Sequence, residues 1–135
     1  MEAELRYLHQ TTTDQIIKCF YEVYNTLGYG FLEKVYERAM MVELLANNIS
    51  AGSQVPVKVR YKGELVGDYV ADIIVDGIVI IEIKASESIA EEHESQLINY
   101  LKATDIEIGL LLNFGKKPEI RRKIYTNDRK KLEHR

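Results

Sequence analysis

The first third of the chain repeats apolar residues at intervals of three and four. Over residues 13–48 this spacing is typical of amphipathic helices, which bury one stripe of side chains. Gly28 and Gly30 interrupt it, and glycine is the residue that most readily ends a helix in a left-handed turn. We therefore predict two helices joined by a glycine turn, the first capped by Thr12 or Thr13. The apolar residues expected to face the core from the second helix are Leu32, Val35, Tyr36, Ala39, Met40, Val42 and Leu45.

From residue 54 onward, apolar and polar residues alternate one by one. This period is typical of half-exposed strands and covers residues 54–61 and 65–75, with a turn at Lys62-Gly63 between them. A third strand is predicted over residues 78–85. It is apolar on both faces at its start, as expected for a central strand that is covered on both sides.

The last part of the chain predicts one more helix and one more buried strand. The helix covers residues 88–102, with Ser86 or Ser88 as its cap, and the strand covers residues 108–113. Residues 120–125 fit either an edge strand or a short helix. The order helix, helix, three strands, helix, strand predicts an α/β fold in which helices pack on a mixed sheet.

Length and composition exclude several classes of protein. A chain of 135 residues corresponds to one domain, and 46% hydrophobic with 29% charged residues is not the composition of a disordered or collagen-like protein. No apolar run reaches the roughly 18–20 residues that span a bilayer, and residues 1–10 lack the apolar core of a signal peptide. A single cysteine, Cys19, excludes an internal disulfide framework, so we expect a reducing, cytoplasmic setting with no membrane partner.

Charge is distributed unevenly along the chain. The formal net charge of −3, taken as a whole, argues weakly against binding to nucleic acid. Residues 116–135, however, carry +6, which leaves −9 for residues 1–115. A basic segment beside an acidic body is either an interaction surface or an ordinary solvated end, and both interpretations stay open at this point.

Charged residues inside the strands give the strongest chemical clue. Glu82 and Lys84 are two residues apart in the most hydrophobic strand, so they share a face, and Asp72 lies in the preceding strand. Burying such charges is costly unless they have partners or bind a metal. Two carboxylates and an ammonium group suit a Mg²⁺ site in which lysine orients or deprotonates a metal-bound water. The alternative is a plain Glu82–Lys84 ion pair at the exposed end of a strand.

The loop between these strands decides whether the carboxylates share a face. A two-residue turn would put Asp72 on the face opposite Glu82. A three-residue loop over residues 75–77, with Gly77 left-handed, pairs residue 72 with residue 80 and puts Asp72 and Glu82 on one face. We predict the three-residue loop.

The last predicted helix carries a polar stripe. His93, Gln96 and Tyr100 are spaced by three and four residues and therefore lie on one helix face. Gln96 and Tyr100 can hydrogen-bond the Lys84 ammonium, a metal-bound water or a substrate phosphate. The alternatives are an ordinary polar helix face and, for His93, a surface residue with no role as a ligand.

These residues together resemble the PD-(D/E)XK nuclease superfamily. Asp72 followed by Glu82-Ile83-Lys84 is similar to its D…ExK signature, and residues 96–100 are similar to the QxxxY helix motif of RecB-type members. Residues 30–36 match the motif of the small GxxExxY family, and the whole resemblance runs from about residue 16 to residue 114. Ala71 stands where the superfamily usually has proline.

The resemblance implies a fold and an activity. The expected fold is a three-layer sandwich with a restriction-endonuclease-like αβββαβ core, preceded by an extra N-terminal helix. The whole chain, residues 1–135, is then a single nuclease-like domain with its core at about residues 13–114 and a basic segment at residues 116–135. The implied activity is Mg²⁺- or Mn²⁺-dependent hydrolysis of phosphodiester bonds in nucleic acid, with DNA favoured over RNA.

The resemblance also assigns roles to individual residues. Asp72 and Glu82 would hold the metal, with Glu33 adding a carboxylate from the helical layer. The expected catalytic residues are Lys84, which would position or activate the attacking water, and Gln96 and Tyr100, which would orient Lys84 and the scissile strand. Two alternatives stay open: a non-catalytic nuclease-fold module that binds nucleic acid or a partner protein, and a subunit that needs a homodimer or another partner to complete its site.

Overall fold

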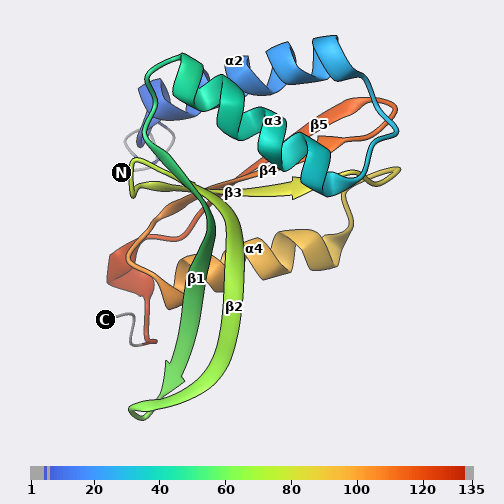
Figure 1. Cartoon of the computed structure of the whole chain (residues 1–135). Coiled ribbons are helices and arrows are strands. Elements are labelled where there is room, and N and C mark those ends of the chain that lie inside the picture. Colours follow the sequence, from blue (N-terminus) through green and yellow to red (C-terminus); the bar gives the residue numbers. More distant parts are fainter. Residues whose placement is uncertain (1–4, 6, 133–135) are drawn as a thin grey trace.

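The computed structural model describes residue 5 and residues 7–132, which form three layers (Figure 1). Helices α2 (Gln10–Leu27) and α3 (Glu33–Ala46) cover one face of a sheet, and α4 (Glu91–Ala103) covers the other. The expected α/β three-layer fold with an additional N-terminal helix is therefore confirmed. None of the helices in the described part of the chain is long and apolar enough to cross a membrane.

The sheet is mixed and keeps the order of the sequence. Its strands, in spatial order, are β1 (Ala51–Tyr61), β2 (Glu64–Val75), β3 (Val79–Lys84), β4 (Ile108–Phe114) and β5 (Pro118–Ile124). Strands β3 and β4 are parallel because α4 connects them, and the other neighbours are antiparallel. Part of the segment left open by the sequence becomes the edge strand β5, and a short 3-10 helix, η1 (Asn127–Arg129), follows it.

Alternating residues of the central strands fill two separate cores. On β3, Ile81 and Ile83 face α2 and α3, whereas Ile80 faces α4 together with Leu111 of β4. This alternation follows from the two-residue period of a strand. Glu82 and Lys84 share the parity of Ile80, so the candidate site lies on the α4 side of the sheet.

The predicted helix caps are wrong at both positions. Helix α2 begins after His9, and Thr13, one of its two expected caps, is buried with its hydroxyl donating to the carbonyl of Gln10. Helix α4 begins after Ala90, and the hydroxyl of Ser86 donates to the carbonyl of Ser88 rather than to a helix N–H. Thr12 and Thr13 lie inside α2 rather than at its N-cap. Ser86 and Ser88 lie ahead of the N-cap of α4, so none of these hydroxyls is placed to cap a helix.

Helix α3 buries fewer of its apolar residues than predicted. Tyr36 and Met40 are fully buried as expected. Leu32 is 82% exposed and Val42 is 70% exposed, because α3 lies in an outer layer and only one side of it contacts α2 and the sheet.

The loop between β2 and β3 has the predicted length and is displaced by one residue. Val75 pairs with Val79, so the loop covers residues 76–78, and Gly77 is left-handed with φ 68°. Ile73 pairs with Ile81, which puts Asp72 opposite Glu82 rather than opposite residue 80. Both registers have the same parity, so Asp72 and Glu82 lie on one face.

Candidate active site

Asp72 lies where strand β2 separates from β3. The β2–β3 pairing ends at Ile73, and beyond this point β1 and β2 continue alone as a hairpin that curves away from the sheet (Figure 1). Gln54, opposite Asp72 in the β1–β2 register, has φ 53°, a left-handed conformation that few residues other than glycine adopt. Beyond Ile73, backbone groups of β2 and β3 that would face each other have no partner in the strand pairing.

The carboxylates of Asp72 and Glu82 each accept a backbone N–H from the other strand at this point. Glu82 Oε2 accepts the backbone N–H of Asp72 at 2.8 Å, and Asp72 Oδ2 accepts the backbone N–H of Ile83 at 2.8 Å. Each side chain is thereby fixed by a hydrogen bond from the backbone of the other strand. The second oxygen of each carboxylate accepts no hydrogen bond from the described residues and is free for a ligand.

Burial makes this pair of acids unfavourable in its fully ionised form. Glu82 is 4% exposed, and burial, followed by the charge of Asp72, raises its pKa to about 8. The pKa of Asp72 is also raised, chiefly by burial. The backbone hydrogen bonds and the charge of Lys84 oppose both shifts without cancelling them. A cation at this position would stabilise the ionised pair.

Two acids of α3 lie near the pair without completing a cluster. Glu33 is exposed at the first position of α3, and its charge raises the pKa of both Asp72 and Glu82. Glu37 is buried and accepts hydrogen bonds from Lys34 at 3.0 Å and from the kinked Gln54 at 2.7 Å. Within the part of the chain that the structure describes, no three His, Cys, Asp or Glu side chains are grouped closely enough to hold a metal ion.

Lys84 ends strand β3 beside the carboxylates. It is half-buried, on the same face as Glu82, and its positive charge lowers the pKa of Asp72 and Glu82. No ion pair joins Glu82 and Lys84 among the described residues, so the alternative of a plain strand-end ion pair does not describe this site.

Helix α4 contributes the other predicted side chains. Tyr100 is buried, and its hydroxyl accepts a hydrogen bond from Gln96 at 2.6 Å. Burial raises the pKa of Tyr100, and the charges of Glu82 and Asp72 raise it further against the opposing effect of Gln96. Tyr100 is therefore within electrostatic reach of both carboxylates. His93 accepts the N–H of Ala90 at 3.1 Å and serves as a helix cap.

Tyr36, the last residue of the 30–36 motif, has a structural position. Its hydroxyl donates to the carbonyl of Gly28 at 2.7 Å and accepts the N–H of Phe31 at 3.2 Å. Its ring stacks on Phe114 of β4, with centroids 4.2 Å apart. Tyr36 thus closes the turn between α2 and α3 and attaches the start of α3, with Glu33, to the sheet.

Comparison with known proteins agrees with this arrangement. A family model described as the PD-(D/E)XK nuclease superfamily matches residues 10–123. The chain belongs to this superfamily. The crystal structure of SSO0001 is similar with a TM-score of 0.56 and 22% identity, over 69% of this chain and 50% of that chain. This likeness shows the fold alone, and the present chain spans half the length of SSO0001. A comparison with curated proteins found no match.

Members of the PD-(D/E)XK superfamily generally use divalent metals, and the donor set of this chain fits one. Asp72 and Glu82 each have one free oxygen, and hard cations such as Mg²⁺ prefer carboxylate oxygens. Mg²⁺ is usually bound by one or two carboxylates together with water and substrate phosphate. Two fixed carboxylates without a third ligand are therefore a sufficient protein contribution.

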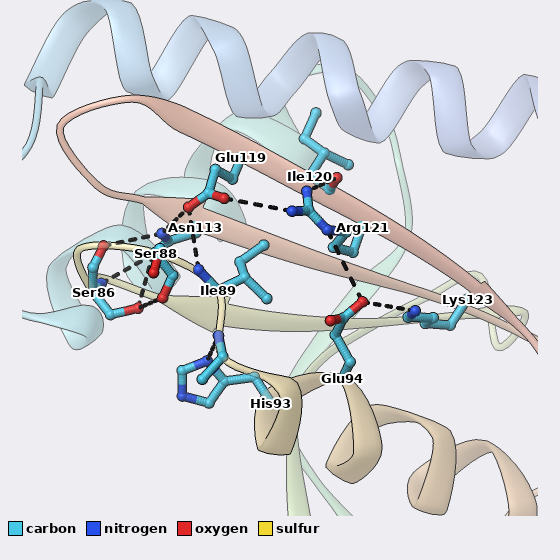
Figure 2. Close-up of polar contacts among 11 residues, drawn as sticks. Ser86, Ser88, Ile89, His93, Glu94, Asn113, Glu119, Ile120, Arg121 and Lys123 are labelled. Carbon is cyan, nitrogen blue, oxygen red and sulfur yellow. Dashed lines mark hydrogen bonds and ion pairs between the residues drawn. The ribbon is translucent and has the colours of Figure 1, made fainter.

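A buried polar network holds the segment between Lys84 and α4 in this superfamily member (Figure 2). Asn113 of β4 is 0% exposed; its oxygen accepts the N–H of Ser86 at 2.9 Å, and its amide donates to the carbonyl of Ser86 at 3.0 Å and to Glu119 at 3.0 Å. Glu119 also accepts the N–H of Ile89 at 3.2 Å. Sequence reasoning missed this network. The available signal was Asn113, a polar residue in an apolar strand. In the structure it pairs with Lys84.

The basic segment is less available than its charge suggests. Lys123 and Arg121 of β5 form ion pairs with Glu94 of α4, at 2.7 and 4.0 Å (Figure 2). Lys130 donates to the carbonyls of Thr104 and Ile106 at 2.8 and 2.7 Å. Much of this segment therefore ties the end of the chain to α4 and its following loop.

Proposed function

We propose that this chain is a metal-dependent nuclease that hydrolyses phosphodiester bonds of nucleic acid, with DNA favoured over RNA. Within the superfamily we assign it to the GxxExxY family on residues 30–36. The observation that carries the proposal is the reciprocal bonding of the buried Glu82 and the half-buried Asp72, each with one free carboxylate oxygen, beside the ammonium of Lys84.

The proposed roles follow from the position of each side chain. Asp72 and Glu82 would hold Mg²⁺ or Mn²⁺, with Glu33 as a further carboxylate from α3. When bound, the metal would offset the charge of the phosphate and lower the pKa of a water. Lys84 would orient the attacking water and stabilise negative charge that develops on the phosphate. Tyr100, held by Gln96, would orient Lys84 and the scissile strand.

A nuclease assay tests this proposal directly. The purified protein would be incubated with Mg²⁺ or Mn²⁺ and single-stranded, duplex and branched DNA, and with RNA, beside Lys84→Ala and Asp72→Ala. We expect each substitution to reduce cutting by about 10²-fold or more. Lys18→Ala, an exposed lysine on α2 in the other helical layer, is the matched control and should cut as well as the wild type. Cutting that survives both site substitutions, or no cutting of any substrate, would contradict the catalytic claim.

The second candidate function is a non-catalytic nuclease-fold module that binds nucleic acid or a partner protein. The net charge of −9 over residues 1–115 and the ion pairs of the basic segment favour its partner-protein form, because affinity for nucleic acid normally comes from free Lys and Arg. Nucleic-acid binding that is indifferent to Mg²⁺ and to Glu82→Ala would support this module. The mass of the protein in solution would show whether a homodimer is part of either function.

A further inference from the structure

A cleft of about 540 Å³ lies between the β1–β2 hairpin and α4. Gln96 and Tyr100 line it, so it adjoins the candidate active site. Tyr69 and Val66 of the hairpin line one side, and Ser95 and Asn99 of α4 line the other. This volume is within the range of about 300–1,000 Å³ that is typical of small-ligand sites.

An exposed aromatic ring forms one wall of this cleft. Tyr69 is 49% exposed, and its ring centroid lies 5.9 Å from that of Tyr100. Gly67 leaves room for the ring, since a Cβ at that position would lie 2.8 Å from Tyr69 Cε2 and 3.2 Å from Val59 Cβ. A large ring that is only half covered, beside a second tyrosine, offers a flat apolar face to a ligand.

The remaining lining indicates the chemistry of that ligand. Among the described residues the cleft contains no Lys or Arg, and its one ionisable acid is Glu92. Phosphate binds to cations or clusters of N–H groups, so this lining does not favour the sugar–phosphate backbone. A side-chain amide at Asn99 and a hydroxyl at Ser95 instead suit the donors and acceptors on the edge of a nucleobase.

We propose that this cleft binds one unpaired nucleobase of the substrate, stacked on Tyr69, while the adjoining phosphate lies at Asp72 and Glu82. The inference rests on the proposed function for the nature of the polymer. A base inside a duplex cannot enter such a cleft without leaving its stack. The substrate at the site is therefore single-stranded or locally unpaired, and recognition is tolerant of sequence because every base has an aromatic face.

A spectroscopic test is available because the chain contains no tryptophan. Tyr69→Trp would place a single reporter in the cleft, and Tyr61→Trp, on an exposed tyrosine of the same hairpin that does not line the cleft, is the matched control. In metal-free buffer at low salt, a short oligothymidylate should quench the emission of Tyr69→Trp and leave that of Tyr61→Trp unchanged. An abasic deoxyribose-phosphate oligomer of equal length should quench neither. Equal quenching by the two oligomers would overturn the proposal.

An affinity measurement gives the size of the effect. Tyr69→Ala should weaken binding of oligothymidylate roughly 5- to 150-fold, the loss expected for one base–aromatic stack, and should leave binding of the abasic oligomer unchanged. Tyr69→Phe and Tyr61→Ala should bind oligothymidylate like the wild type. Wild-type affinity in Tyr69→Ala, or a wild type that does not distinguish the two oligomers, would overturn the proposal.

Cutting, measured separately with metal, distinguishes this inference from the proposed function. A wild type that cuts while Tyr69→Ala retains full affinity would refute the base cleft and leave the nuclease intact. Tyr69-dependent binding of bases by a wild type that cuts nothing would refute hydrolysis and support the cleft.

Discussion

Asp72 and Glu82 each divide two roles between the two oxygens of the carboxylate. One oxygen of each carboxylate accepts a backbone N–H from the other strand, and so takes the place of a strand hydrogen bond where the β2–β3 pairing has ended. The other oxygen is left for a ligand. The side chains of the site therefore also connect β2 to β3 at the point where the two strands separate.

The raised pKa of Glu82 predicts a pH-dependent stability of the metal-free protein. Its pKa is about 8 in the folded protein against an ordinary value of 4.5, so between these values the folded state keeps a proton that the unfolded state releases. Stability from this group is complete below about pH 4.5 and is lost as the pH rises to about 8. We expect the melting temperature in EDTA to fall over this window and the fall to be smaller in Glu82→Gln. A wild-type profile that matches the variant at every pH would contradict this expectation.

At the scale of elements, the order and type of the helices and strands follow from the pattern of apolar residues. The turn at Lys62-Gly63 and the left-handed Gly77 were also predictable, because glycine adopts positive φ at little cost. The helix starts were not predictable, since the residues at the N-caps are His9 and Ala90, which are not among those preferred at that position. Helix α3 shows a further limit: periodicity marks an apolar stripe but not how much of it a neighbour covers.

The pattern of residues predicted the charged side chains of the candidate site but not the backbone conformation around them. Charged residues in an apolar strand identified Glu82 and Lys84, and the parity of a three-residue loop put Asp72 on their face. The kink was hidden, because glutamine gives no indication in the sequence of the left-handed conformation at Gln54. The reciprocal hydrogen bonds and the hydrogen bond from Gln54 to Glu37 likewise became visible only in three dimensions.

The contact between α4 and β4 predicts the effect of a single methyl group. A Cβ on Gly109 would lie 2.6 Å from Leu97 Cδ1 and 2.9 Å from Leu97 Cγ, inside the core that α4 shares with the sheet. Gly109→Ala should therefore destabilise the protein by about 1–3 kcal/mol through overpacking, as measured by urea denaturation. It should also reduce cutting, because α4 carries Gln96 and Tyr100. Gly52→Ala is the matched control, since its Cβ would meet Val55 at an ordinary 3.6 Å. Equal stability of both variants would contradict the close packing.

The segment between β3 and α4 predicts a second stability effect. Asn113→Ala would leave both the N–H and the carbonyl of Ser86 without their partner in a partly buried position. We expect a loss of about 1–3 kcal/mol in the free energy of unfolding, and faster hydrogen exchange at the N–H of Ser86. Asn25→Ala, on the exposed face of α2, is the control and should change little. Unchanged exchange at Ser86 in Asn113→Ala would show that the network does not hold this segment.

At the scale of the whole molecule, the charge distribution limits how nucleic acid can bind. The net charge of −3 separates into −9 over residues 1–115 and +6 over residues 116–135, which first suggests a basic arm. Lys123 and Arg121 are paired with Glu94, and Lys130 is bound to backbone carbonyls, so much of this charge is already in use. An acidic molecule that has part of its basic segment already paired would gain affinity for nucleic acid from another source of positive charge at its active site.

Mg²⁺ would supply that charge, and its binding should be measurable without any substrate. Because only the folded state brings Asp72 and Glu82 together, Mg²⁺ at 100 times its dissociation constant should add about 2.7 kcal/mol of stability and raise the melting temperature by several degrees. Asp72→Asn should abolish this increase, whereas Asp68→Asn, at an exposed ion pair of the hairpin, should retain it. Mg²⁺ should also strengthen binding of a short oligonucleotide to the wild type and not to Asp72→Asn, because the two carboxylates would otherwise repel the phosphate. An equal increase in melting temperature for wild type and Asp72→Asn would place the cation elsewhere, and Lys84 would then be the positive charge that acts on the acidic pair.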